Sequence, residues 1–179
     1  MKFKKLGFST KEGLSLANFE DGWSMEYGKG GSYHCDLLFN NKVVAELTEY
    51  GNGGCLGINR KATNTDLKLA EAAILACLKR LNKDYGPESQ YDLCKNATET
   101  GETEYASLAE MLLNEYDKRK DMAKTFKKGY KYVGIYNNPW GYTKVGGNDK
   151  LAIAMYGSKQ GIEGELKYYT DDYLENKII

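Results

Sequence analysis

The stretch YHCDLLFNNKVVAELTEY, Tyr33–Tyr50, joins two β-type runs through Asn40 and Asn41. Asparagine tolerates the left-handed conformation that both central residues of a type I′ turn adopt, so the stretch predicts a β-hairpin. A two-residue loop would pair Leu38 with Val43 and would leave apolar side chains on both faces. A three-residue loop would instead gather on one face Tyr33, Cys35, Leu37, Phe39, Val43, Ala45 and Leu47. The sequence leaves both registers open.

The segments on either side of the hairpin extend the pattern. Before it, residues 3–8, 14–19 and 22–27 are short β-type runs, which predicts an N-terminal sheet. After it, apolar residues at helical spacing from Thr65 to Gly86 predict an amphipathic helix with Thr65 as its N-cap.

The second half of the chain begins with another helical pattern and returns to β character. Apolar spacing predicts a helix over 103–124 with a basic C-terminal end. Residues 137–149 are expected to form a loop, and 170–177 to include a helical turn. Strands are expected at 130–136, 151–157 and 165–169.

The order β, helix, helix, β is typical of the α+β class. We expect an antiparallel N-terminal sheet with packed helices and a small C-terminal β region. The polar, turn-rich segment 86–102 is the expected boundary between a β-sheet and helix module at 1–86 and a helix with the C-terminal β region at 103–179. These two parts either form separate domains or pack as one.

Composition excludes two classes of function. The 179 residues include 25 lysines and arginines and 25 aspartates and glutamates, so the formal net charge is zero. That balance excludes an acidic mimic of DNA and a highly basic protein that coats nucleic acid. The 15 tyrosines fit either a binding surface or a β-rich fold.

The cysteines and the N-terminus point to the cytoplasm. The four cysteines form no C-x-x-C pair, so the spacing of a structural zinc site is missing, and we interpret them as reduced, mostly buried thiols. The basic N-terminal stretch lacks the apolar run of a signal peptide, and no segment is apolar enough to cross a membrane. No motif for a cofactor is visible, and none is expected. The cysteines are Cys35, Cys55, Cys77 and Cys94.

Two local patterns are interpreted as structural. The glycines at Gly51, Gly53, Gly54 and Gly57 lack P-loop spacing and are separated from the following helix, so they predict a turn and not a phosphate site. His34 is the only histidine and precedes Cys35 directly. Neighbouring residues of a strand point to opposite faces, so this pair cannot form a cysteine nucleophile with its base.

An acidic pattern near the C-terminus leaves a nuclease hypothesis open. Glu165 and Lys167 have the acidic-x-lysine spacing of many metal-dependent nucleases, with Glu163 or Asp149 as the nearby acidic partner. Such a site needs two carboxylates to hold magnesium and a lysine to steady the attacking water. The same spacing arises on an ordinary solvated strand face.

The segment from Lys118 to Tyr142 combines lysines with aromatic residues. A basic surface beside aromatic rings is how proteins hold phosphate backbones and single strands, through counterion release and stacking. The same residues would also suit a solvated helix end followed by a half-buried strand. The candidate contact residues are Lys124, Lys127, Lys128, Tyr130, Lys131 and Tyr132.

The segment Trp23–Tyr85 contains the hairpin with its asparagine turn and lysine, a G-x-G-G turn and an alanine-rich helix. In this order it resembles small accessory proteins of phages and other mobile elements, among them the anti-CRISPR inhibitors of Cas9. The resemblance implies a cytoplasmic protein of the host cell that binds a CRISPR-Cas effector, its guide RNA, or both. It transfers no functional residue. A metal-dependent nuclease acting on RNA or DNA and a plain RNA or single-strand binder are the alternatives.

Overall fold

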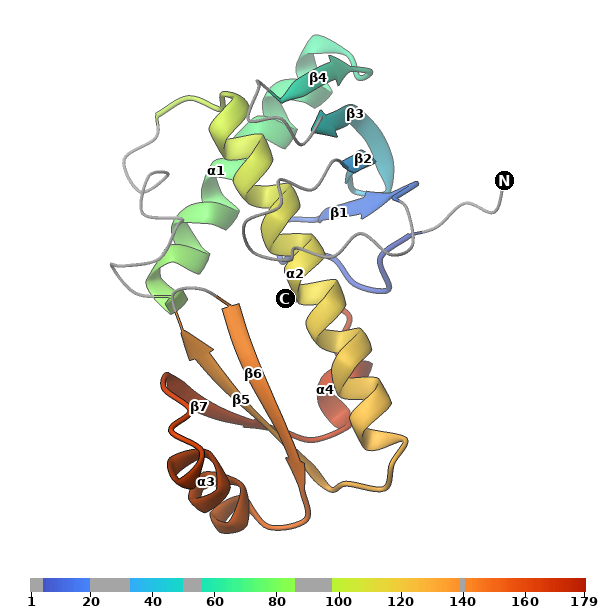
Figure 1. The fold of residues 1–179 in the computed structure, drawn as a ribbon. Helices are drawn as coiled ribbons and strands as arrows, with labels where there is room; N and C mark the ends of the chain where they lie inside the picture. Colours follow the sequence, from blue (N-terminus) through green and yellow to red (C-terminus); the bar gives the residue numbers. More distant parts are fainter. Residues whose placement is uncertain (1–4, 20–32, 50–55, 86–97, 139–140) are drawn as a thin grey trace. The chain divides into compact units, whose positions relative to one another are not determined.

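The computed structural model divides into two compact units (Figure 1). It describes residues 5–19, 33–49, 56–85, 98–138 and 141–179. Unit 1 comprises Met1–Glu115 and Lys177–Ile179, and unit 2 comprises Tyr116–Asn176. The long helix α2, Glu102–Phe126, runs through the division between them. The sequence placed its expected boundary earlier, in the polar segment 86–102.

Unit 1 contains the expected antiparallel N-terminal sheet. Its strands are β1 Leu14–Ala17, β2 Tyr33–Phe39, β3 Lys42–Glu49 and β4 Gly57–Arg60, hydrogen-bonded in that order. All neighbouring strands are antiparallel. Residues 3–8 form no regular strand in their described part, where Lys5 makes an isolated bridge to Ala17. The strand expected at 22–27 lies outside the described residues.

The hairpin of β2 and β3 combines the two registers that the sequence left open. Asn40 and Asn41 have φ angles of 49° and 66°, so they form the left-handed two-residue turn. A register shift between Leu37 and Leu38 then marks a β-bulge. Beyond the bulge Leu37 pairs with Ala45, as the longer loop would require. The buried face formed in this way contains Cys35, Leu37, Ala45 and Leu47.

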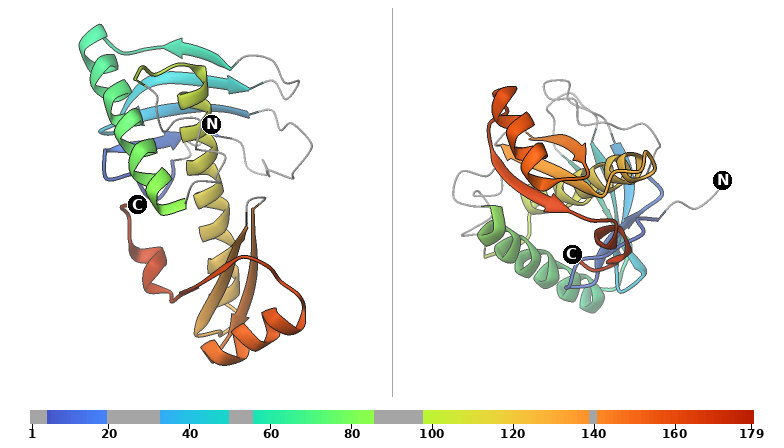
Figure 2. Two further views of the ribbon diagram at one scale, coloured as in Figure 1. Left: turned by 90° about the vertical axis from the view of Figure 1, so that its left-hand side faces the viewer. Right: turned by 90° about the horizontal axis from the view of Figure 1, so that it is seen from below.

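Helices α1 and α2 lie beside the sheet in unit 1 (Figures 1 and 2). α1 is Asn64–Tyr85, and its N-cap is Thr63 and not the expected Thr65. The hydroxyl of Thr63 accepts from the backbone N–H of Asp66 and donates to the Asp66 carboxylate, which satisfies one of the unpaired donors of the first turn. The helical spacing buries Ala70, Ile74, Cys77, Leu78 and Leu81 of α1 and Tyr105, Leu108, Ala109, Met111, Leu112 and Leu113 of α2.

A charged cluster fastens α1 to the turn before β1. Arg80 donates from Nε and NH2 to the two carboxylate oxygens of Glu12 at 2.8 and 2.9 Å, and from NH2 to the main-chain oxygen of Ile179 at 3.1 Å. Burial by itself raises the pKa of Glu12, but the hydrogen bonds and charge of Arg80 outweigh it. The net effect lowers the Glu12 pKa from 4.5 to about 2.

Unit 1 is therefore expected to lose stability in acid. A carboxyl whose pKa is lowered on folding stabilises the fold fully above its unfolded pKa of 4.5, and this contribution disappears as the pH falls toward 2. We expect the loss to be about 2 kcal/mol, allowing for solvent screening of the partly exposed pair. Urea unfolding between neutral pH and acid, read by amide exchange in α1, measures it. Arg80→Gln should flatten this pH dependence, and an unchanged slope in that variant would contradict the assignment.

Unit 2 is a three-stranded antiparallel sheet with helices. Its strands are β5 Tyr132–Asn138, β6 Gly141–Gly147 and β7 Glu165–Tyr169, in the order β6-β5-β7. Its helices, besides the end of α2, are α3 Lys150–Lys159 and α4 Asp172–Glu175. The expected strands at 130–136 and 165–169 and the final helical turn are confirmed.

Two expectations for unit 2 are wrong. Residues 151–157, expected as a strand, belong to α3, and the expected loop at 137–149 contains β6. The carboxylate of Asp149 accepts from the backbone N–H of Leu151 at 2.8 Å, so it caps a helix at that point. A short apolar run fits a buried strand and a helix equally well, and here the cap decides between them.

The sheet of unit 2 packs on both faces. Val133 and Ile135 of β5 form a buried cluster with Met122 of α2. On the other face, Gly134 and Tyr136 lie against α3, where the Tyr136 hydroxyl donates to the main-chain oxygen of Ile153 at 3.0 Å. Figure 2 shows α3 beside the sheet. Because successive residues of a strand point to opposite faces, Tyr132 of β5 lies on the same side as Gly134 and Tyr136.

Candidate functional site

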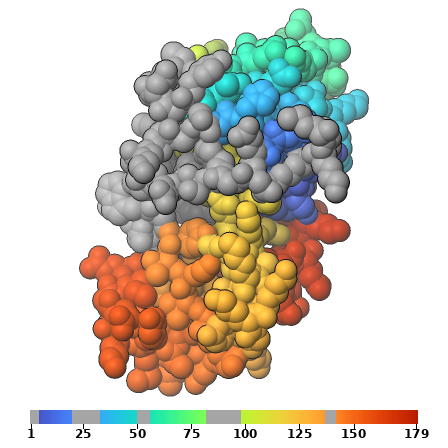
Figure 3. Space-filling view, turned by 45° about the vertical axis from the view of Figure 1, so that its right-hand side comes forward, coloured from blue at the N-terminus to red at the C-terminus, as the bar shows by residue number. Residues whose placement is uncertain are grey.

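The end of α2 positions the predicted basic residues. Backbone N–H groups of Lys128 and Gly129 donate to the carbonyls of Thr125 and Phe126 at 3.0 and 2.8 Å, which closes the last turn. Gly129 has φ of 86°, the left-handed conformation that commonly follows a helix and favours glycine. The chain therefore turns sharply and enters β5 at Tyr132. The last turns of α2 lie at the surface (Figure 3).

Three lysines of this turn are exposed. Lys127, Lys128 and Lys131 make no ion pair with any residue that the structure describes. The sequence of unit 2 carries eleven lysines and arginines against eight aspartates and glutamates, so an excess of positive charge is confined to this part of a neutral chain. These side chains are available for an anionic partner.

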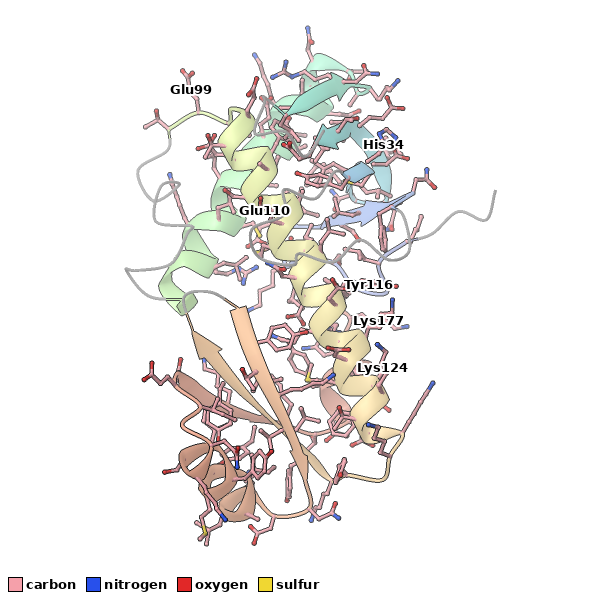
Figure 4. All side chains as sticks on the ribbon, in the orientation of Figure 1. His34, Glu99, Glu110, Tyr116, Lys124 and Lys177 are labelled. Carbon is pink, nitrogen blue, oxygen red and sulfur yellow. The ribbon has the colours of Figure 1, made fainter. Side chains whose placement is uncertain are left out.

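Lys124 has a different environment from its neighbours. It projects from the end of α2 (Figure 4), and its ammonium lies 3.3 Å from the Asp121 carboxylate, which Lys144 also approaches at 2.9 Å. Burial raises the pKa of Asp121, but hydrogen bonds from Lys144 and Lys124 outweigh it and lower the pKa. Asp121 thus offsets part of the charge of both lysines.

The tyrosines between Lys118 and Tyr142 differ in how far their rings are exposed. Tyr130 is 41% exposed, and its ring lies over Gly146 of β6, where an added Cβ would come within 2.7 Å of the ring. Tyr136 is buried, with its hydroxyl bonded inside the unit, and Tyr142 packs against the core. Trp140 lies outside the described residues. Tyr130 is therefore the tyrosine whose ring is exposed to a binding partner.

Tyr132 lies beside Lys150, a lysine that the sequence did not single out. The ammonium of Lys131 lies 5.3 Å from the Tyr132 ring centroid, and that of Lys150 lies 5.2 Å from it. Lys150 also lies over the ring of Tyr168 at 5.5 Å, and its main-chain oxygen accepts from the Tyr168 hydroxyl. Cations over tyrosine faces are held by the ring quadrupole. We call Lys127, Lys128, Tyr130, Lys131, Tyr132 and Lys150 the basic surface of unit 2.

Of the residues of the nuclease hypothesis, the structure pairs Glu165 with Lys167. Glu165 and Lys167 share one side of β7 and form an exposed ion pair at 3.4 Å. Glu163 is exposed before the strand, and Asp149 caps α3. Within the described ranges, no three histidine, cysteine, aspartate or glutamate side chains are grouped so that they could hold a metal ion.

The histidine and the cysteines have structural environments. His34 is exposed on β2 (Figure 4), with Nδ1 3.0 Å from the hydroxyl of Thr48 on β3. Cys35 is fully buried on the other face, as strand alternation predicts. Burial raises the pKa of the Cys35 and Cys77 thiols to about 12, so both are inert as nucleophiles. Both are free thiols, whereas Cys55 and Cys94 lie outside the described residues. Gly51, Gly53 and Gly54 of the expected turn also lie outside them, and Gly57, expected in that turn, begins β4.

Comparisons with known proteins add no relative. No protein-family model matches the chain, and no curated protein or solved structure matches it either. In the part of the chain that the structure describes, no helix has the length and apolar composition needed to span a bilayer. The resemblance of Trp23–Tyr85 to anti-CRISPR proteins stays a prediction from sequence.

Proposed function

We propose that this protein acts by binding, and that the basic surface of unit 2 contacts the phosphate backbone of RNA. The observation that carries the proposal is the exposure of Lys127, Lys128 and Lys131 without a carboxylate partner among the described residues, beside the open ring of Tyr130. Ammonium groups gain affinity for phosphates by releasing condensed counterions, and an aromatic ring can stack on an unpaired base.

The partner we propose is a CRISPR-Cas nuclease, Cas9, carrying its guide RNA. The resemblance of the hairpin segment to mobile-element proteins supports this choice, and the basic surface supplies a means of contacting RNA held by a protein. Inhibition would follow from occupying the effector or its guide, so the chain needs no cofactor of its own. Such a protein would work in the cytoplasm of the host cell.

Charge reversal of the basic surface tests the proposal. The triple variant Lys127→Glu, Lys128→Glu and Lys131→Glu is expected to weaken binding to the Cas9–guide RNA complex about a hundredfold near physiological salt. It should also reduce the slope of log affinity against log salt by about three, because three phosphate contacts are lost. Fluorescence anisotropy with labelled guide RNA, free and in complex with Cas9, measures both quantities.

A matched control separates the surface from overall charge. Lys42, Lys68 and Lys79 are exposed lysines of unit 1, and reversing all three changes the net charge by the same amount. This control should bind as the wild type does. Equal weakening in both triple variants, or no binding by the wild type, would refute the proposal.

The same reagents distinguish the alternatives. Wild-type protein should block DNA cleavage by Cas9 and leave the guide RNA intact on a denaturing gel. Equal affinity for free and Cas9-bound RNA, with cleavage undisturbed, would indicate a plain RNA binder. A guide shortened only with magnesium present, and protected by Glu165→Ala, would indicate the nuclease.

A further inference from the structure

Helix α3 is apolar on the side that faces away from its own unit. Only Ile153 and Gly157 of this helix are buried. Leu151 is 67% exposed, Met155 64% and Tyr156 52%. A helix that covers a sheet ordinarily turns polar residues outward, whereas α3 exposes these three large apolar side chains.

The packing of α3 explains why these side chains are not used in the core. Glycines line the contact between α3 and the sheet, and a Cβ added at Gly134 or Gly147 would come within 2.5 or 2.8 Å of Ile153. At Gly157 an added Cβ would collide with the Tyr136 hydroxyl. The helix therefore lies close to the sheet, and Ile153 is the one large side chain that the helix itself buries against it. The exposed side chains of Leu151, Met155 and Tyr156 therefore add little to the core of unit 2.

The charges at the ends of α3 complement each other. Asp149 is exposed at the N-terminal end and Lys159 at the C-terminal end, with the apolar side chains between them. An antiparallel copy of the same helix would bring each Asp149 beside the other copy's Lys159, and would also oppose the two helix dipoles. It would place each Leu151 beside Met155 and Tyr156 of the second copy.

We propose that α3 is a self-association surface, on which α3 of a second copy packs antiparallel through Leu151, Met155 and Tyr156. The contact is isologous, so assembly closes at a dimer. A helix of this length spans about 15 Å, which makes the interface small and the dimer weak, with Kd on the order of 10–100 µM.

The proposed dimer leaves the basic surface accessible. The Lys150 ammonium lies over the rings of Tyr132 and Tyr168 of the sheet, on the side of the helix that faces its own unit. The self-association surface and the basic surface therefore use different sides of α3, and the inference does not depend on the proposed function.

Sedimentation of the full chain from about 1 µM to about 1 mM tests the proposal. The wild type is expected to shift from monomer to dimer and no further. The double variant Leu151→Glu with Met155→Glu should remain monomeric throughout. Leu69 of α1 is 55% exposed, so Leu69→Glu is a matched control that should dimerise normally.

Charge variants test the antiparallel orientation. Lys159→Glu should weaken the dimer about tenfold, because the new carboxylate faces Asp149 of the other copy. Adding Asp149→Asn removes that repulsion and keeps an N-cap side chain, so it should recover part of the affinity.

Several results would overturn the proposal. A wild type that is monomeric up to about 1 mM would exclude a second copy as the occupant of this face. Binding of that monomer to phosphatidylserine vesicles, lost in Leu151→Glu with Met155→Glu, would assign the face to a membrane instead. Dimers that persist in this double variant, or assemblies that grow beyond the dimer, would show a different interface.

Discussion

Gly157→Val is expected to destabilise unit 2 by about 3 kcal/mol. A Cβ at this position overlaps the hydroxyl and ring of Tyr136, whose hydroxyl donates to the Ile153 carbonyl. The valine can be accommodated only if α3 moves away from the sheet or the tyrosine leaves its buried position. Amide exchange of β5, followed with increasing urea, measures the loss within unit 2.

Ser158→Val is the matched control for that result. Ser158 is the next residue of α3 and is exposed, so the valine carries the same β-branched cost in a helix without a collision. Its effect should stay within about 0.5 kcal/mol. Combining Gly157→Val with Tyr136→Ala should cost less than the sum of the two single changes. A Gly157→Val protein as stable as Ser158→Val would contradict the packing of α3 described here.

Tyr105→Ala is expected to cost unit 1 about 4 kcal/mol. Tyr105 of α2 is fully buried, and its hydroxyl lies 3.3 Å from the carboxylate of Glu71 on α1. Arg60 of β4 reaches the same carboxylate at 3.7 Å, and the Thr100 hydroxyl donates to the Glu71 main-chain oxygen. The ring thus fills the core where α1, α2 and β4 meet. Removing it leaves a large cavity.

Tyr105→Phe separates the ring from its hydroxyl. It keeps the buried volume and loses one hydrogen bond to a carboxylate, so it should cost about 1 kcal/mol. Burial, together with the negative charge of Glu71, raises the Tyr105 pKa to about 12, so the hydroxyl stays protonated and donates at neutral pH. Urea unfolding of the two variants, read by amide exchange in α1, tests the difference. Equal losses for Phe and Ala would contradict the cavity argument.

Local signals in the sequence predicted most of unit 1. The Asn40-Asn41 turn, the strands beside it and the amphipathic spacing of α1 and α2 each depend on neighbours in the chain, and each is present. The N-cap is Thr63 and not Thr65 because α1 begins one residue before Thr65, at Asn64, so Thr65 already lies in the first turn of the helix. The strand β4 was missed because its four residues carry no distinct apolar pattern.

In unit 2 the local signals were weaker. The run LAIAMYG is short and apolar, which suits strand and helix alike. The capping role of Asp149 was the signal that distinguished them. β6 lies in a glycine-rich stretch that was interpreted as a loop, although it pairs with β5, the strand directly before it in the chain.

In the candidate site, too, some residues could be found from local sequence and others only from the fold. Lys127, Lys128, Tyr130 and Lys131 could be found from sequence because they lie in one short basic segment. Lys150 could not, because its place beside Tyr132 depends on the path of α3 over the sheet. The ion pair of Lys124 with Asp121 is local to α2, whereas the approach of Lys144 to the same carboxylate depends on how β6 lies beside α2.

The sequence by itself determined the α+β class, the hairpin turn, the two long helices and the basic segment, since these follow from backbone preferences and from the period of apolar residues. Tertiary structure alone decided the bulge that reconciles the two hairpin registers, the place of Lys150 beside Tyr132, and the exposed apolar side chains of α3. Those features depend on contacts between residues far apart in the chain. Their free energies come from packing and burial, which a local pattern does not contain.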